Sequence, residues 1–582
     1  MNHGGRAGRA LDVAPKDVII RFRECPSPGP DNVLRLHVLH TAALLAAAAV
    51  PVALGAQAPA PPTHSSGDST AALATRGPVR ALSTIGSRAE ERTRDDQLRG
   101  NASDAGWLMR SPSSLTPWSA TRGAASVVAP EIAVGWNSAI PVARNDGSLR
   151  GGRGAETRVM TGVMLQGGPL RLIVAPEIVY AQNRAFEDVL PDTWSDSQRV
   201  TYRAPWLAGR NSADLPYRFG GASETRVLPG QSSLTLRGGL LAVGAATESQ
   251  WWGPGVRNAI LFTNQAPGIP HLFARTARPV RTPLGALEFK WIAGALERSE
   301  WADSAQARWR SLSSAGVVLH PAFAPGLSLG AARSVYAEAD GGMGSTLSNA
   351  ADVFVRWRAA GNVANPDPFE QMTSLFGRWV FPSAGAEVYA EWARYRFPSL
   401  RQLMETPENS QGYVFGGQWL RPAGRSAVRL QTEFTFLERS PASFANPSRS
   451  WYASAAVPGG YTNQGEGIGS AVGPGGSGQW IAGDWLRGDT RIGVFLGRVR
   501  WANDAYYDYP GSLLSRYRGH DVTGYGGARG AAALGALSFD LEYSLGKRYN
   551  YLFQSRAGDW DQRDNTRNVV NSSLQLRVTA RP

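Results

Sequence analysis

The strongest constraint in this 582-residue sequence is a two-residue alternation of apolar and polar side chains that runs from about residue 125 to residue 580. In 428–436, Val428, Leu430, Phe434 and Phe436 alternate with arginine, glutamine, glutamate and threonine. Successive side chains of a strand point to opposite faces of a sheet, so the pattern predicts strands with one apolar and one polar face. The same pattern recurs at 287–295, 353–357, 537–545 and 574–580.

One predicted strand departs from strict alternation. In 492–501 the apolar residues change from one parity to the other. A β-bulge inserts one extra residue into a strand and produces such a change, so the segment predicts a bulge.

Two kinds of connection separate the predicted strands. The short ones contain Gly, which adopts positive φ, or Pro, which fixes φ, and both suit tight hairpins. They are 167–169, 324–326, 382–385 and 422–424. The long ones are polar, aromatic and glycine-rich, at 340–349, 440–451, 459–478 and 504–520. Short turns at one rim and long loops at the other are typical of an outer-membrane barrel.

Amphipathic strands also occur in β-sandwiches and secreted β-helices, but three features favour a barrel. Residues 125–582 show one uniform composition, and no apolar run after residue 58 reaches the ~18 residues of a spanning helix. Aromatic residues such as Trp379, Trp419 and Trp485 lie near predicted strand ends, where girdles form at the membrane interfaces. Lipid requires every strand edge to be paired, which a closed sheet achieves. The fold class is therefore all-β, a transmembrane outer-membrane barrel spanning 125–582.

The N-terminal part predicts export. An apolar run at 42–54 follows the basic Arg35 and precedes the small residues at 55–58, as in a secretory signal peptide. We assign 34–58 to a cleaved signal peptide, 1–33 to an extension from a start site placed too early, and 59–85 to a flexible leader. The single cysteine, Cys25, precedes this cleavage site, and the chain carries a formal net charge of +13. A basic exported surface favours anionic partners such as lipid head groups or acidic glycans.

Residues 86–124 predict a small periplasmic segment of helix and loop. Ser87 to Arg99 has Glu90 and Glu91 in its first turn and Arg99 at its end, the charge order that a helix dipole favours.

The sequence offers little catalytic or metal chemistry. After residue 58 the histidines are His64, His271, His320 and His520, too far apart for a metal-ligand pattern, and no G-x-S-x-G motif occurs. The glycine-rich run 465–478 lacks the Lys-Ser/Thr of a phosphate loop. Arginines and aromatics at 498–509 suit a barrel lumen and its loops better than nucleic acid. We therefore predict no enzyme activity, no cofactor, no metal and no nucleic-acid partner.

Aromatic residues in the predicted loops suit sugar binding. Sugar rings stack their C–H faces on Trp or Tyr, and their hydroxyls pair with Asn, Asp, Gln and Arg. The candidates are Trp451, Tyr452, Tyr461, Trp480, Trp485, Tyr506, Tyr507 and Tyr509. The alternative for each of them is a place in the interfacial girdle.

One stretch resembles a known family. Gln250-Trp251-Trp252-Gly253-Pro254-Gly255, followed by an apolar run and Asn264-Gln265-Ala266-Pro267-Gly268-Ile269-Pro270, is similar to the most recognisable part of the Wzi family of capsule assembly proteins. Residues 94–117 and 387–417 also resemble the family. Gln265 stands where a second Asn is usual, and 393–395 lacks an expected acidic residue. The motif residues Trp251, Trp252, Gly253, Pro254, Asn264, Ala266, Pro267 and Pro270 are candidates for a structural or a binding role.

The resemblance implies an outer-membrane barrel of about eighteen strands, a small periplasmic helical part and a non-enzymatic, lectin-like role. The predicted function is attachment of capsular or exopolysaccharide to the surface of a Gram-negative-type bacterium. The expected partners are a surface polysaccharide, outer-membrane lipid and the barrel assembly machinery. Two alternatives stay open: a porin or specific channel, and a lipid-modifying enzyme in which His320 or His520 lies beside a Ser.

Overall fold

The computed structural model describes residues 79–118, 123–186, 206, 212–302, 306–339, 343–356, 368–395, 400–405, 408, 410–440, 450–508, 519–553 and 567–581. The predicted N-terminal extension, the signal peptide, most of the leader and Tyr509 lie outside these ranges.

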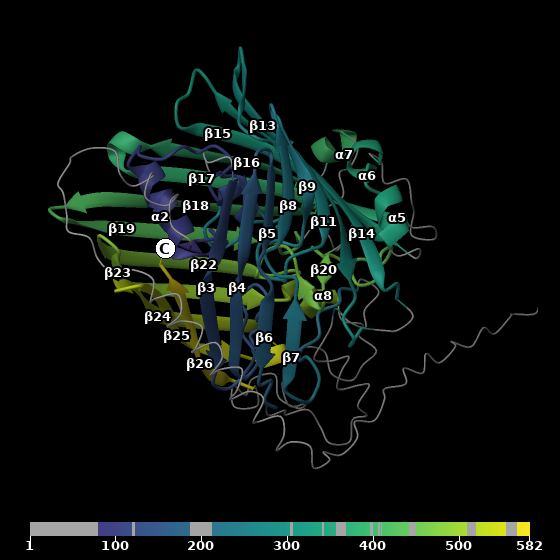
Figure 1. Cartoon of the computed structure of the whole chain (residues 1–582). Helices are drawn as coiled ribbons and strands as arrows, with labels where there is room; N and C mark the ends of the chain where they lie inside the picture. Colours follow the sequence, from purple (N-terminus) through teal and green to yellow (C-terminus); the bar gives the residue numbers. More distant parts are fainter. Residues whose placement is uncertain are drawn as a thin grey trace, which may run out of the picture. The chain divides into compact units, whose positions relative to one another are not determined.

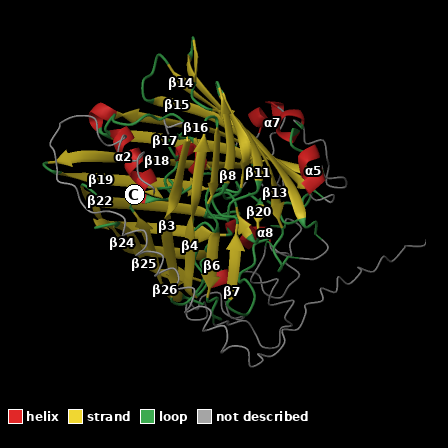
Figure 2. Ribbon diagram, viewed as in Figure 1, coloured by secondary structure: helices red, strands yellow, loops and turns green. Residues whose placement is uncertain are grey.

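Within the described residues, eighteen antiparallel strand positions follow one another around a closed sheet (Figures 1 and 2). Three positions are formed by two short strands each. In order the strands are β3 (Gly123–Asn137), β4 (Gly154–Gly167), β5 (Leu170–Val174) with β6 (Glu177–Ala181), β7 (Glu224–Leu228) with β8 (Ser233–Gly238), β9 (Leu241–Ala246), β11 (His271–Thr276) with β12 (Val280–Thr282), β13 (Gly285–Glu297), β14 (Trp309–Pro321), β15 (Leu327–Glu338), β16 (Phe369–Phe381), β17 (Ala386–Tyr395), β18 (Gln411–Ala423), β19 (Ser426–Phe436), β22 (Ser477–Arg487), β23 (Thr490–Trp501), β24 (Asp521–Leu534), β25 (Leu537–Tyr549) and β26 (Val569–Ala580).

The sheet closes where the last strand meets the first. β26 pairs antiparallel with β3, from Ser573 opposite Asn137 to Thr579 opposite Glu131. The two-residue strand β1 (Val79–Arg80) adds a parallel pairing to β3. Closure gives each of the eighteen strand positions a hydrogen-bonded neighbour on both sides, which a sheet in lipid requires.

The connections alternate between short and long, as predicted. Each of the four predicted short turns joins neighbouring strands, and Gly168, Gly326, Gly385 and Gly424 adopt positive φ there. The long connections all begin and end at the other rim; they are 138–153, 182–223, 247–270, 298–308, 339–368, 396–410, 437–476, 502–520 and 550–568. We call the two rims the short-turn end and the long-loop end. In outer-membrane barrels they face the periplasm and the exterior, respectively.

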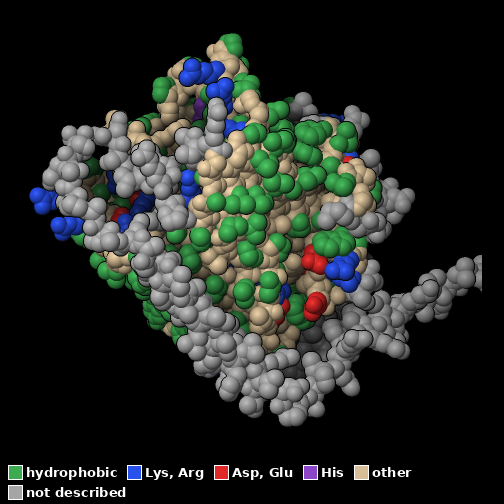
Figure 3. Space-filling view, viewed as in Figure 1, with side chains coloured by type: hydrophobic (Ala, Val, Ile, Leu, Met, Phe, Trp, Pro, Cys, Tyr) green, Lys and Arg blue, Asp and Glu red, His purple; other side chains and the backbone are tan. Residues whose placement is uncertain are grey.

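The alternation has the predicted phase. On β19, Val428, Leu430, Phe434 and Phe436 are exposed on the outer wall, whereas Arg429, Gln431, Glu433 and Thr435 are buried inside. Figure 3 shows apolar side chains spread over the visible strands. Trp379, Trp419 and Trp485 are exposed on the outer wall near the short-turn end, where a girdle is expected.

Two local predictions are wrong. The segment 353–357 is no strand where it is described: α6 (Asp352–Val355) is helical there, and Val353 packs on Val335, Ala337 and Phe369. β23 has no bulge, since its register with β22 and β24 is continuous. Its apolar residues lie on both faces of the strand, because Phe495 and Val499 pack into the interior core. The barrel's register shift lies in β3, between Val128 and Glu131.

Helices occur at both rims. The predicted N-terminal helix is confirmed as α2 (Arg88–Leu98), whose N-cap Ser87 accepts a hydrogen bond from the Glu90 amide. The same segment contains β2 (Met109–Arg110) and α3 (Pro112–Leu115). The long connections carry α5 (Met343–Ser348), α6, α7 (Leu400–Glu405), α8 (Asn503–Asp508) and the short hairpin β20 (Thr462–Asn463) with β21 (Glu466–Gly467). None of the helices in the described ranges has the length and apolar content needed to cross a membrane.

A charge on the outer wall tests the membrane position of the sheet. Leu430 lies midway along β19 and is 47% exposed, so Leu430→Arg should lower the free energy of unfolding by about 2–4 kcal/mol in lipid vesicles. Urea unfolding followed by tryptophan fluorescence measures the loss. The control, Ser383→Arg, places the same charge in an exposed short turn and should change stability little. Equal effects of the two variants would contradict a lipid-facing wall.

Candidate functional site

The lumen of the barrel is filled by the chain itself, and Arg94 of α2 shows how. Its Nε donates to Oε1 of Glu387 on β17 at 2.8 Å. Its Nη2 donates to the carbonyl of Pro254 at 2.7 Å, and its Nη1 to that of Gly255 at 3.3 Å. One buried guanidinium therefore joins the N-terminal helix, the wall and the 247–270 connection.

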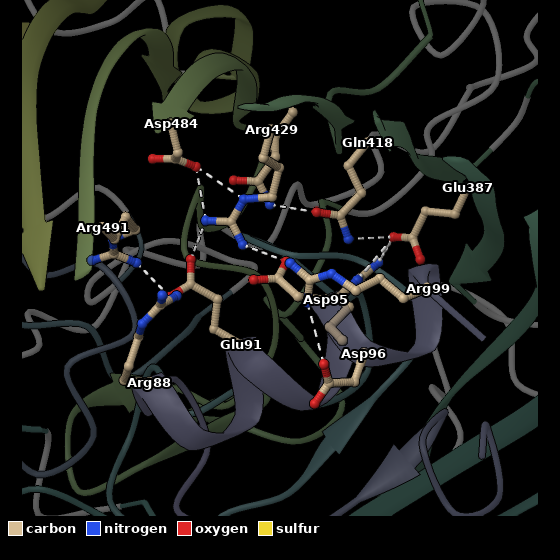
Figure 4. A network of polar contacts seen from close by, with 12 residues as sticks. Arg88, Glu91, Asp95, Asp96, Arg99, Glu387, Gln418, Arg429, Asp484 and Arg491 are labelled. Atoms are coloured by element: carbon tan, nitrogen blue, oxygen red, sulfur yellow. Dashed lines mark hydrogen bonds and ion pairs between the residues drawn. The ribbon is translucent and has the colours of Figure 1, made fainter. Parts of the chain in front are cut away.

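Further arginines extend this network around α2 (Figure 4). Arg429 on β19 binds Asp484 of β22 at 2.7 Å and Asp95 of α2 at 2.9 Å, and it also binds Glu91. Arg491 on β23 adds a second ion pair to Glu91 at 2.5 Å. Burial raises the pKa of Glu91, but the guanidiniums of Arg429 and Arg491 outweigh it and hold the pKa well below its usual value. Glu91 is therefore a carboxylate that binds α2 to the wall.

The family-like motif forms the second layer of the filling. β10 (Trp251–Trp252) pairs antiparallel with β2 inside the barrel, with Trp252 opposite Met109. Gly253 follows at φ +131°, and a Cβ there would lie 2.9 Å from Oε2 of Glu391. Only glycine fits both the conformation and the space.

Two carboxylates of the wall hold the connection after the motif. Glu391 on β17 accepts the amide of Ile260 at 3.2 Å, and Glu433 on β19 accepts the amide of Val256 at 2.6 Å. Buried backbone amides need such partners, because an unsatisfied amide is costly away from water.

The end of the motif organises neighbouring loops. Asn264 donates through Nδ2 to the carbonyl of Asn145 at 3.0 Å, and Gln265, the unusual residue, accepts the amide of Asn145 at 2.7 Å. Pro270 accepts the amide of Ala295 at 3.1 Å, and Pro267 accepts Nδ2 of Asn463 at 3.3 Å. Trp251, Trp252, Gly253, Pro254, Asn264, Ala266 and Pro267 are buried, and Pro270 is half-buried. In this structure the motif residues pack the lumen.

The predicted sugar-contacting aromatics separate into four groups. Trp451, Tyr452 and Tyr461 are at most 1% exposed, and the Tyr452 hydroxyl donates to the carbonyl of Ile260 at 2.8 Å. They form an aromatic core beneath the long connections, so their rings offer no free face to a sugar. Sequence reasoning placed them in outer loops correctly but could not show that the loops fold inward.

The other candidates lie apart from this core. Trp480 faces inward beneath the guanidiniums of Arg257 and Arg529, at 5.2 and 5.1 Å from its ring centroid. Trp485 lies on the outer wall, as the girdle alternative predicts. Tyr506 and Tyr507 of α8 lie at the long-loop end beside His520, and Tyr507 is 50% exposed. Tyr509 lies outside the described residues.

Sequence reasoning missed a pocket at the long-loop end. Its volume is about 180 Å³, and its lining includes Arg150, Tyr217, Arg218, Phe219 and Glu466. The run Tyr217-Arg218-Phe219 is a signal that the sequence carries, since it combines aromatic rings with a cation in a long connection. A deeper cavity of about 210 Å³ lies beside α2, among the paired arginines.

The alternative of a lipid-modifying enzyme requires a Ser beside His320 or His520. His320 does lie between Ser328 Oγ at 2.9 Å and Glu288 Oε1 at 2.8 Å. However, these side chains face the lumen rather than lipid, Ser328 is 2% exposed, and Glu288 also accepts the amide of Gly106. Acyl chains have no access to this Ser. Among the described residues, no cluster of His, Cys, Asp and Glu could hold a metal ion.

Closed walls, a filled lumen and long outer connections define the class: an outer-membrane β-barrel plugged by its own chain. Residues 142–510 match the family described as "Capsule assembly protein Wzi". The match spans more than half of the chain, so the protein belongs to the Wzi family, and the resemblance noted in the sequence is confirmed. A search of curated proteins found no match.

One solved structure supports the fold, and two further outer-membrane proteins align more weakly. Wzi of Escherichia coli, described as an outer-membrane protein involved in group 1 capsule assembly and a carbohydrate-binding β-barrel, aligns with a TM-score of 0.51 at 12% identity, over 78% of this chain and 85% of that one. OprD from Pseudomonas aeruginosa aligns with a TM-score of 0.36 at 8% identity, over 79% and 93% of the chains. The channel DcaP of Acinetobacter baumannii reaches 0.30 at 9% identity, over 79% and 98%.

Removing one carboxylate should show how strongly the ion-pair network stabilises the polypeptide that fills the lumen. Glu387→Gln would leave Arg94 buried without its paired carboxylate and Arg378 paired with Asp104 alone, at a cost of about 3–5 kcal/mol in the free energy of unfolding. Urea unfolding in detergent measures it. Glu405→Gln is the control, since it removes an exposed carboxylate paired with Arg401 and should cost less than about 1 kcal/mol. Similar losses would argue against a stabilising network.

Proposed function

We propose that this protein attaches capsular or exopolysaccharide to the outer surface of the cell and binds it at the long-loop end without chemical turnover. The observation that best supports this proposal is the filled lumen, in which Arg94 connects α2 with the carbonyls of Pro254 and Gly255. Membership of the Wzi family supports the role in capsule assembly. The carbohydrate binding described for the E. coli protein supports the ligand class.

The filling argues against the porin alternative. A porin needs a continuous water-filled lumen lined by polar side chains. Here α2 occupies the short-turn end, and the connection 247–270 crosses the middle, where Ile260 and Phe262 are buried in the core. Two successive layers of chain therefore interrupt the path from one rim to the other.

The proposed topology exposes the binding end to the cell surface. The short turns and α2 would face the periplasm, and residues 34–58 would act as a signal peptide removed during export. The barrel assembly machinery would insert the chain. A long polysaccharide would be held by several weak contacts at once, since linked sites raise the overall affinity.

Polysaccharide retention tests the proposal directly. Deleting the gene should move surface polysaccharide from the cell-bound to the shed fraction, because nothing would then hold it. Uronic-acid and neutral-sugar assays on both fractions measure the shift, and expression from a plasmid should reverse it. An unchanged partition would overturn the attachment role.

Conductance separates the anchor from the porin. The purified barrel in a planar lipid bilayer should give no large, stable current steps, because the lumen is occupied at two levels. A general porin reconstituted in the same bilayer serves as the positive control. Large stable steps from this protein would favour the channel.

A further inference from the structure

The pocket at the long-loop end has the composition of a sugar site. We call it the loop pocket. Four long connections meet there and contribute Arg150, Asn183, the run Tyr217–Phe219, Gln265 and Glu466. Its volume of about 180 Å³ suits a single sugar residue of a longer chain rather than an extended oligosaccharide.

Aromatic side chains provide the stacking surface. Phe219 packs edge-on against Trp301, with ring centroids 5.4 Å apart, and the guanidinium of Arg150 lies 4.0 Å from the Phe219 ring centroid. Tyr217 packs edge-on against Phe186 at 6.1 Å. The Arg150 guanidinium covers a face of the Phe219 ring, whereas the Tyr217 ring lines the pocket and is only half-buried, so it can meet the C–H face of a sugar.

The walls of the loop pocket are held in place by the chain itself. Asn183, at φ +46°, donates through Nδ2 to the carbonyls of Phe219 at 2.6 Å, Gly220 at 3.1 Å and Ala222 at 3.0 Å. Gly465 also packs against Phe219, since a Cβ at this position would come within 2.8 Å of the ring. Such preorganisation lowers the entropy cost of binding.

The charges in the loop pocket favour an anionic ligand. Arg218 donates through Nη2 to the carbonyls of Asn183 at 2.7 Å and Gly221 at 3.2 Å, and no carboxylate of the described residues pairs with it. Arg150, by contrast, is paired with Glu224 at 2.8 Å. Within the described part of the chain, Arg218 is therefore the cation of the pocket lining that has no carboxylate partner.

The one carboxyl group in the lining is Glu466, and it adds no fixed negative charge. The residue is 5% exposed, and its Oε2 has no hydrogen-bond partner within the described ranges. Burial raises the pKa of Glu466 to about 8, although Arg226 and Arg150 act in the opposite direction. At pH 7 the group is therefore mainly neutral.

We propose that the loop pocket binds one carboxylate-bearing sugar residue, such as a uronic acid, of the surface polysaccharide. Arg218 would pair with the sugar carboxylate, and Tyr217 would stack on the ring. The inference rests on the proposed function and specifies the glycan class.

Methyl glucuronide and methyl glucoside test the charge preference, because they differ only in the carboxylate. Titration of the detergent-solubilised protein, followed by saturation-transfer NMR at pH 7, should show binding of the glucuronide about tenfold tighter than of the glucoside. Arg218→Gln should abolish this preference, and Arg218→Lys should restore part of it. Arg425→Gln removes the same charge from an exposed short turn and should leave the preference intact.

Each remaining outcome overturns the inference. Equal affinities of the wild-type protein for the two glycosides, or a preference that survives Arg218→Gln, would exclude a carboxylate site at Arg218. If the wild-type protein nevertheless retains the whole polysaccharide on cells, the proposed sugar site in the loop pocket is rejected and the attachment role is kept. If it retains none, both the sugar site and the attachment role are rejected. Heat-modifiable migration in gels confirms that each variant forms the barrel.

Discussion

Backbone hydrogen bonding in lipid is the constraint on which the rest of this structure depends. A strand edge inside a membrane has no water to pair with, so the sheet must close, and it does so through the pairing of β26 with β3. Closure places one set of alternating side chains in lipid and the other set inside. The lumen that the interior side chains line then has to be filled with polypeptide or water.

This chain fills its interior with polypeptide and compensates the charges that the polar strand faces bring inside. Arg429 reaches carboxylates of both β22 and α2, and Arg94 reaches Glu387 and two backbone carbonyls. Buried ions are tolerated only when they are paired and hydrogen-bonded. The network thus explains why the inward-facing strand residues include both acidic and basic side chains, and why most of the buried residues of α2 are charged.

Much of the fold was predictable because its causes are local. The alternation of Leu430 with Arg429 and Gln431 is a property of consecutive residues, and so are the Gly- and Pro-containing turns such as 382–385. The helix at 87–99 was predictable from its cap and its charge order. The wrong predictions concern segments whose structure depends on residues that are distant in the sequence. Phe495 faces the interior and belongs to the buried core that also contains Tyr452 and Tyr461. The sequence of its own strand does not indicate this apolar surrounding.

The candidate site was predictable only in part, for the same reason. The candidate aromatics have different surroundings: Trp451 and Tyr452 are buried in a long connection, whereas Trp485 lies on strand β22 and faces the outside of the wall. The loop pocket is formed by residues from connections that are hundreds of positions apart, such as Arg150 and Glu466. Their proximity depends on how four connections pack on one another.

The sequence by itself determined the barrel, the phase of its strands, the alternation of short and long connections and, through one tryptophan- and proline-containing motif, the family. These follow from steric and hydrogen-bonding rules that act over a few residues. Only the tertiary structure decided that the motif packs the lumen, that three candidate aromatics are buried, and that no carboxylate of the described residues pairs with Arg218. Those features depend on non-local packing and charge compensation, which a linear pattern does not encode.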